Sequence, residues 1–160
     1  MKNTMKVAAR GDREILVTRD FDATRDQVFE AYTRPELLKR WLGGGPGGFG
    51  GWSLEVCEVD LVVGGAYRWV WRKEGAEMGI SGRYLEIARP DRLVCTEKFD
   101  DAWYEGEGHN TLELTEKAGK TTFTLILRYQ SEATRDGVLK SPMETGMAVS
   151  YDALEALLGS

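Results

Sequence analysis

The chain has 160 residues, 42% of them hydrophobic and 29% charged, and a formal net charge of −5. This length suffices for one domain with a full hydrophobic core, and the interspersed acids and bases leave no basic patch for nucleic acid. No apolar run approaches the ~18 residues of a membrane span, and the N-terminus lacks a signal-peptide core. We therefore expect a cytoplasmic protein with no nucleic-acid or membrane partner.

The start of the chain carries little pattern. Residues 1–12 show no hydrophobic periodicity, so we expect a flexible N-terminus followed by a single domain at 13–160. Residues 14–21 (EILVTRDF) alternate in polarity and predict a first strand.

Two short helices are predicted next. Thr24 with Gln27 three residues later is a capping-box pattern that opens the first helix. The second helix begins near Thr33, has Pro35 in its first turn and ends at Gly43. Residues 43–51 read GGGPGGFGG, a density of glycine that predicts a loop. It is either a connector or a lid over a cavity, with Phe49 and Trp52 as apolar contacts.

Strand patterns dominate the middle of the chain. Six segments alternate in polarity between turn-like sequences: 53–63, 66–73, 78–88, 92–99, 108–116 and 121–129. Because the connections between them are short, neighbouring strands must be antiparallel. With the strand at 14–21 this predicts about seven strands, six of them in a continuous meander.

The C-terminal segment returns to a helical period. A short helix is expected at 132–139, and Ser141-Pro142-Met143-Glu144 is a strong start for a longer one. One apolar stripe runs along that helix to the stop at Gly159, formed by Met143, Met147, Tyr151, Leu154 and Leu158. Such a stripe must be buried, and the sheet is the only large partner available.

The predicted class is therefore α+β, with the order β-α-α-β6-α. A curved antiparallel sheet wraps around the long C-terminal helix, which is the helix-grip arrangement. Several segments, in this order and spacing, resemble the family homologous to the activator of heat-shock-protein-90 ATPase, within the SRPBCC (START-like) superfamily. The segments are ATRDQVF at 23–29, Pro35-Glu36 through Trp41, VCEVDL at 56–61 with Gly64-Gly65, GRYLEI at 82–87 with Pro90, Arg92 and Leu93, and Gly146-Met147 through Tyr151 to Leu154.

The chain departs from this family at two places. Val62 stands where relatives commonly carry arginine before the glycine pair, and the loop at 43–51 is unusually rich in glycine. The resemblance implies a cavity between sheet and helix, and it permits ligand binding, catalysis or co-chaperone activity without selecting one of them.

Aromatic residues are the main candidates for the walls of such a cavity. Tyr67, Trp69 and Trp71 share one face of a strand, which should point at the helix. Three such rings can pack as core or line a site for a guest. Both interpretations stay open on the sequence.

Glu97 is the candidate polar group. It shares a strand face with Leu93, Cys95 and Phe99, so it is an acid among apolar neighbours. It either reaches solvent or pairs with an arginine, or else it serves as a polar anchor or general acid inside the cavity. By the same alternation Asn110 points inward, while His109, the only histidine, points to solvent.

We expect a small-molecule binding protein whose guest is apolar or aromatic. The candidate ligand-binding residues are Trp41, Trp52, Tyr67, Trp69, Trp71, Tyr84, Glu97, Asn110, Met147 and Tyr151. The first alternative is a cavity enzyme of the cyclase, dehydratase or hydrolase kind, with Glu97 as the catalytic acid–base and Tyr84 as a donor. The second is activation of a chaperone ATPase.

The cysteines and the single histidine give no sign of a disulfide, a metal site or a cofactor. Cys57 and Cys95 are isolated and are expected to be buried free thiols. One histidine and no cluster with ligand spacing predict no metal site and no cofactor. Trp103 and Phe49 are candidate exposed aromatics that would support a homodimer.

Overall fold

A computed structural model describes residues 4–42, 52–102, 104, 106–141 and 143–159, and it contains one eight-stranded antiparallel sheet and four helices. The strands are β1 (Lys6–Arg10), β2 (Glu14–Phe21), β3 (Ser53–Val59), β4 (Ala66–Lys73), β5 (Ala76–Ala88), β6 (Arg92–Phe99), β7 (Gly108–Lys117) and β8 (Lys120–Arg128). The helices are α1 (Arg25–Thr33), α2 (Pro35–Trp41), α3 (Glu132–Lys140) and α4 (Met143–Leu158). The predicted α+β class and helix-grip arrangement are confirmed.

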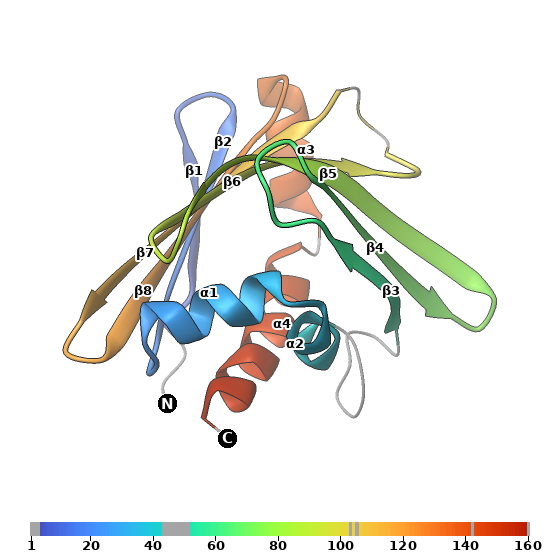
Figure 1. Cartoon of the computed structure of the whole chain (residues 1–160). Helices are drawn as coiled ribbons and strands as arrows, with labels where there is room; N and C mark the ends of the chain where they lie inside the picture. Colours follow the sequence, from blue (N-terminus) through green and yellow to red (C-terminus); the bar gives the residue numbers. More distant parts are fainter. Residues whose placement is uncertain (1–3, 43–51, 103, 105, 142, 160) are drawn as a thin grey trace.

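The sheet arches over the helices (Figure 1). Its strand order is β1-β2-β8-β7-β6-β5-β4-β3, so β3 to β8 form the predicted six-strand meander. The register shifts between Leu54 and Val56 in β3 and between Tyr84 and Glu86 in β5. Such bulges bend a strand and increase its twist, which helps the sheet curl around its contents.

The N-terminal prediction is wrong. Part of the segment expected to be flexible forms β1, which pairs with β2 in register from Lys6↔Thr18 to Arg10↔Glu14. The sheet therefore has eight strands instead of about seven. Four of the five residues of β1 are exposed, and a strand without a buried face has no alternation to reveal it.

The first two helices begin where the sequence indicates. Thr24 caps α1: its hydroxyl accepts from the backbone N–H of Gln27, and the Gln27 side chain accepts from the backbone N–H of Thr24. Pro35 occupies the first turn of α2. The glycine-rich segment at 43–51, and with it any lid that includes Phe49, lies outside the described residues.

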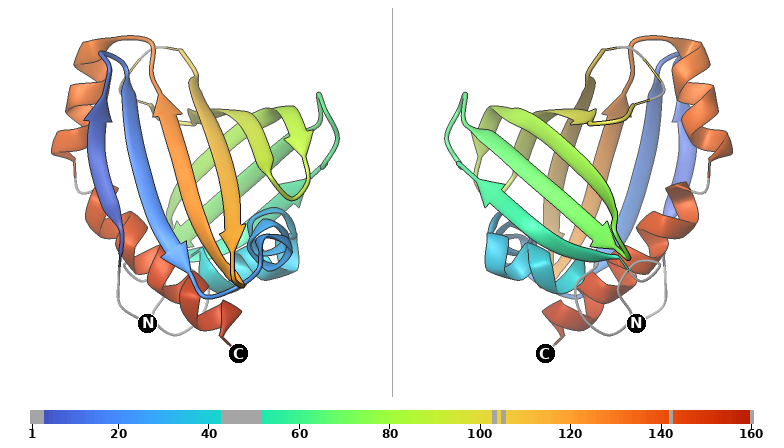
Figure 2. Two further views of the ribbon diagram at one scale, coloured as in Figure 1. Left: turned by 90° about the vertical axis from the view of Figure 1, so that its left-hand side faces the viewer. Right: turned by 90° about the vertical axis from the view of Figure 1, so that its right-hand side faces the viewer.

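Helix α4 crosses beneath the sheet from the β1–β2 side toward α2 (Figure 2). Among the described side chains of its apolar stripe, Tyr151 and Leu154 are buried, and Met147 and Leu158 are half-buried, as an inward-facing stripe predicts. The C-terminal half of α4 packs on an aromatic cluster from four other elements, formed by Phe21, Tyr32, Trp41, Phe123 and Tyr151. Their ring centroids lie 5.1–6.3 Å apart.

A buried arginine reinforces this contact. Arg19 occupies a core position of β2 and is 1% exposed. Its Nη2 donates to Asp152 Oδ1 at 2.8 Å and to Glu155 Oε1 at 3.3 Å, both on α4. Among the described residues its Nε and Nη1 find no hydrogen-bond acceptor. The guanidinium therefore depends on α4 for the compensation of its charge.

No helix in the described ranges is both long and apolar enough to cross a bilayer. The cytoplasmic location and the single domain stay predictions.

The ion pairs between Arg19 and α4 should be measurable in the free energy of unfolding. Replacing Asp152 by Asn and Glu155 by Gln leaves the buried guanidinium without a counter-charge. The two acids also lie near the C-terminal end of α4, where the helix dipole disfavours them, so we expect a net loss of about 1–2 kcal/mol in urea denaturation. Arg19→Met should cost less than this double variant, because it removes the buried charge itself.

Glu74→Gln is the control for the loss of a negative charge, since Glu74 is exposed in the β4–β5 turn, outside any helix. A double variant as stable as the Glu74→Gln protein would show that the ion pairs do not hold α4 on the sheet.

Candidate functional site

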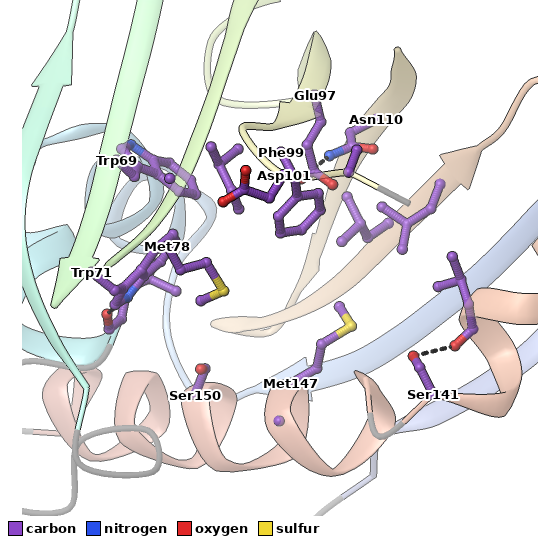
Figure 3. Close-up of a pocket in the computed structure, with 18 of the residues that line it drawn as sticks. Trp69, Trp71, Met78, Glu97, Phe99, Asp101, Asn110, Ser141, Met147 and Ser150 are labelled. Atoms are coloured by element: carbon purple, nitrogen blue, oxygen red, sulfur yellow. Dashed lines mark hydrogen bonds between the residues drawn. The ribbon is translucent and has the colours of Figure 1, made fainter. Parts of the chain in front are cut away.

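A pocket of about 630 Å³ lies between the concave face of the sheet and α4. All four helices and strands β4 to β8 contribute residues to its lining, and Figure 3 shows lining side chains that come from the sheet and from α4. The volume falls within the ~300–1,000 Å³ typical of small-molecule sites. The N-terminal half of α4 borders this space, whereas the C-terminal half is packed against the aromatic cluster.

Strands β4 and β5 form one wall. Trp69 and Trp71 project from β4, and Met78 projects from the position of β5 paired with Trp71. The two indole rings are nearly perpendicular, with centroids 6.1 Å apart. Trp71 Nε1 donates to the carbonyl of Leu42 at 2.6 Å, which fixes that ring. Trp69 Nε1 is buried without a hydrogen-bond acceptor in the described part of the chain.

Helix α4 forms the opposite wall. Met147, Ser150 and Tyr151 lie three and four residues apart, so they share one helical face toward the pocket. Figure 3 shows Met147 and Ser150 pointing up from α4 toward the sheet. Gly146, which is buried, also lines the pocket and adds no side-chain volume there.

Trp41 and Tyr32 line the pocket beside the buried Tyr151. Trp41 Nε1 donates to the carbonyl of Ala31 at 2.8 Å, so α1 fixes the orientation of the α2 indole. Burial and the neighbouring Tyr151 hydroxyl raise the pKa of Tyr32, and burial raises the pKa of Tyr151. Both phenols therefore stay neutral and hydrogen-bonding at physiological pH.

Glu97 and Asn110 form the polar centre of the pocket. They project from β6 and β7, and Asn110 Nδ2 donates to Glu97 Oε2 at 2.9 Å (Figure 3). Asn110 is paired across the sheet with Cys95, two residues before Glu97, so the two side chains share the concave face. The alternation in the sequence had placed both on this side.

Burial raises the pKa of the Glu97 carboxyl, and the hydrogen bond from Asn110 opposes this only in part. Among the described residues no lysine, arginine or histidine forms an ion pair with Glu97. Of the alternatives left open by the sequence, pairing with an arginine is therefore not found in the described structure, and the carboxyl group is half-buried. A carboxyl group without a cation, inside a pocket, is a candidate for contact with a guest.

Comparison with known proteins identifies the family. The family model "Activator of Hsp90 ATPase homolog 1-like protein" matches residues 22–159, nearly the whole chain. The chain belongs to this family. No curated protein matched the chain.

Solved structures agree with this assignment to the Activator of Hsp90 ATPase homolog 1-like family. A protein from Rhodobacter sphaeroides is 31% identical with a TM-score of 0.88, and the match covers 97% of this chain and 98% of that one. A Nitrosomonas europaea protein is 25% identical with a TM-score of 0.79, covering 94% and 97%. A structure from Plasmodium falciparum described as an HSP90 activator is 21% identical with a TM-score of 0.66, covering 92% and 96%. At that identity the last likeness shows the fold alone.

Seven of the ten residues predicted for the site line this pocket of the Hsp90-activator-like fold. They are Trp41, Trp69, Trp71, Glu97, Asn110, Met147 and Tyr151. Whether these residues bind a ligand stays a prediction. Trp52 is half-buried and lines no pocket described in the structure.

Tyr67 and Tyr84 lie behind the main pocket. They line a neighbouring space of about 40 Å³, too small for a sizeable guest. Tyr67 Oη donates to the carbonyl of Thr96 at 2.5 Å, and its ring covers Gly82, where an added Cβ would lie 2.6 Å from the ring. Tyr67 is thus a packing residue, and Tyr84, at 5.4 Å between ring centroids, packs against it.

Several lining residues fall outside the ten predicted for the site. Tyr32 lies in α1, and Tyr104 lies in the loop before β7. Tyr129 continues the inward alternation of Leu125 and Leu127, a signal that could have identified it. Burial raises the pKa of Tyr104 to about 12 and also raises that of Tyr129, and their rings meet edge to face at 5.8 Å.

The remaining candidate groups lie elsewhere. His109 is exposed, as predicted from its place in β7. In the described residues, no group of three or more histidine, cysteine or acidic side chains is placed to hold a metal ion. Cys57 and Cys95 are free and half-buried, and burial raises their thiol pKa values to about 11 and about 12. Trp103, proposed for a homodimer, lies outside the described residues.

The raised pKa of Glu97 predicts a pH-dependent stability difference between wild type and Glu97→Gln. Because the folded state binds this proton more tightly than the unfolded state, the contribution of Glu97 is favourable below the unfolded pKa of about 4.3 and is lost as the pH rises through the folded pKa. Glutamine removes the charge and can still accept from Asn110. We expect Glu97→Gln to be the more stable protein at neutral pH, with the difference shrinking in mild acid.

Urea denaturation of both proteins, at neutral pH and in mild acid, measures this difference in stability. Glu74→Gln is the control for the loss of one negative charge, since Glu74 is exposed in the β4–β5 turn. A Glu97→Gln protein that is less stable than wild type at neutral pH would contradict the assignment of Glu97 as a half-buried, uncompensated acid.

Proposed function

We propose that this protein binds a small, largely apolar molecule in the pocket between the sheet and α4. The observation that carries the proposal is the space of about 630 Å³ at the centre of the fold, where a well-packed domain would hold side chains. Its walls come mainly from aromatic and aliphatic residues, while Glu97 and Asn110 offer a few polar atoms to orient a guest.

The arrangement supports binding by preformed walls. Hydrogen bonds from the indoles of Trp41 and Trp71 to backbone carbonyls hold these rings in place before any guest arrives. A rigid wall loses little conformational entropy on binding, so more of the burial of apolar surface contributes to affinity.

One specific observation favours a second candidate, an enzyme that uses Glu97 as an acid–base group. A carboxyl that lines a cavity and has a pKa raised by burial is a frequent feature of general acids. In that case Glu97→Gln should abolish turnover and leave guest binding intact. Activation of an Hsp90 ATPase is not favoured, because the likeness to the HSP90 activator shows the fold alone.

Native mass spectrometry before and after mild organic extraction tests binding directly. We expect a co-purifying mass that is lost on extraction. The extracted protein should then bind naphthylmethanol, a neutral aromatic probe, in a calorimetric titration. Failure of both measurements would contradict the proposal.

A filled pocket should lose this binding. Ser150→Phe places a ring in the pocket from α4, and we expect the Kd for naphthylmethanol to rise by about 10-fold or more, because the added side chain occupies the space of the guest. Val149→Phe adds the same ring one residue away, at a position that is 40% exposed and does not line the pocket. Equal affinity in the two variants would place the probe outside the pocket.

A further inference from the structure

The charges that line the pocket are of one sign. Glu77, Glu97 and Asp101 contribute acidic side chains, and no lysine, arginine or histidine is found among its described lining residues. Glu77 Oε2 accepts from Arg72 Nε at 2.9 Å, so its charge is balanced outside the pocket. Asp101 is exposed in the turn after β6. Neither Asp101 nor Glu97 forms an ion pair in the described structure, but Asp101 is open to solvent, so Glu97 is the lining acid that is partly shielded from water and still lacks a compensating cation.

The described residues meet the hydrogen-bonding and charge requirements of the Glu97 carboxylate only in part. Asn110 donates to one carboxylate oxygen, Oε2, and a neutral amide leaves the charge itself uncompensated. Asp100, which directly follows β6, is by contrast compensated by a cation: Arg68 donates to both of its carboxylate oxygens, at 2.7 and 2.6 Å. A buried carboxylate can be stabilised either by a proton or by a cation brought in from outside.

The surrounding walls would favour the cation. Trp69, Trp71, Tyr104 and Tyr129 all line the same space, and faces of aromatic rings attract organic cations by their quadrupole. The phenols also have no charge at neutral pH, because burial raises the pKa of both tyrosines. Aromatic walls around one acid are a poor environment for an anionic guest and a favourable one for an apolar ammonium ion.

We propose that the guest carries a basic nitrogen, which pairs in its protonated form with the Glu97 carboxylate while its apolar body lies between the β4 tryptophans and Met147. This inference rests on the proposed binding function and names the chemical class of the guest: a hydrophobic amine. The amide of Asn110 holds the carboxylate in position for this contact.

Three probes with one apolar body and different charge test this class: naphthylmethylamine, naphthylmethanol and naphthoate. In calorimetric titrations of the extracted wild-type protein, we expect the amine to bind about 10-fold tighter than the alcohol or better, because an ammonium–carboxylate ion pair replaces a hydrogen bond from an uncharged hydroxyl. Naphthoate should bind most weakly. An amine that binds no better than the alcohol would overturn this inference and leave the proposed function standing.

The Glu97→Gln variant tests whether the charge of Glu97 causes the preference for the amine. The advantage of the amine over the alcohol should disappear, because both probes then meet a neutral amide, and the remaining binding of the alcohol reports an intact pocket. Glu74→Gln removes a surface charge instead and should retain the advantage. A preference for the amine that survives Glu97→Gln would also overturn the inference. If no probe binds wild type and no co-purifying mass is found, the proposed function itself fails.

Discussion

The contact between α4 and the sheet is the constraint on which the rest of the structure depends. A nearly straight helix cannot follow a strongly curved sheet along its whole length. The C-terminal half of α4 is held by the aromatic cluster around Tyr151 and by the pairs of Arg19 with Asp152 and Glu155. The N-terminal half then spans the concavity without filling it. The pocket is therefore a geometric result of where the helix is anchored.

The same geometry explains the state of Glu97. Its strand position lies over the unfilled part of the concavity, so neither core packing nor bulk solvent surrounds the carboxyl group. A fully packed core would exclude such an acid, and an exposed one would be solvated. The anchored helix leaves an open space, and the uncompensated acid in that space offers a guest a polar contact. In this way the fold itself creates the proposed binding site.

The sequence was sufficient for the architecture because its signals are local. Short turns required antiparallel neighbours, and the stripe on α4 required a large apolar partner. Alternation also placed Trp69, Trp71, Glu97 and Asn110 on the pocket side. Alternation could not show that Tyr67 is a packing residue while Trp69 and Trp71 line the pocket. Whether a ring meets open space or packs on Gly82 depends on the curvature of the sheet and on the register with the next strand. Tyr32 and Tyr104 reach the pocket only through the tertiary fold, which no local period reports.

Strand β1 has a consequence for the solution behaviour of the protein. The inward side chains of β2 are buried, and β1 covers the outer backbone edge of that strand with five residues that include Lys6 and Arg10. Without this cover, β2 would present unpaired N–H and C=O groups beside a strongly hydrophobic face, which is a template for intermolecular strand pairing. The exposed, charged β1 thus acts as a gatekeeper against aggregation. Shortening the chain before Glu14 would favour oligomers held by edge pairing even if the pocket were intact.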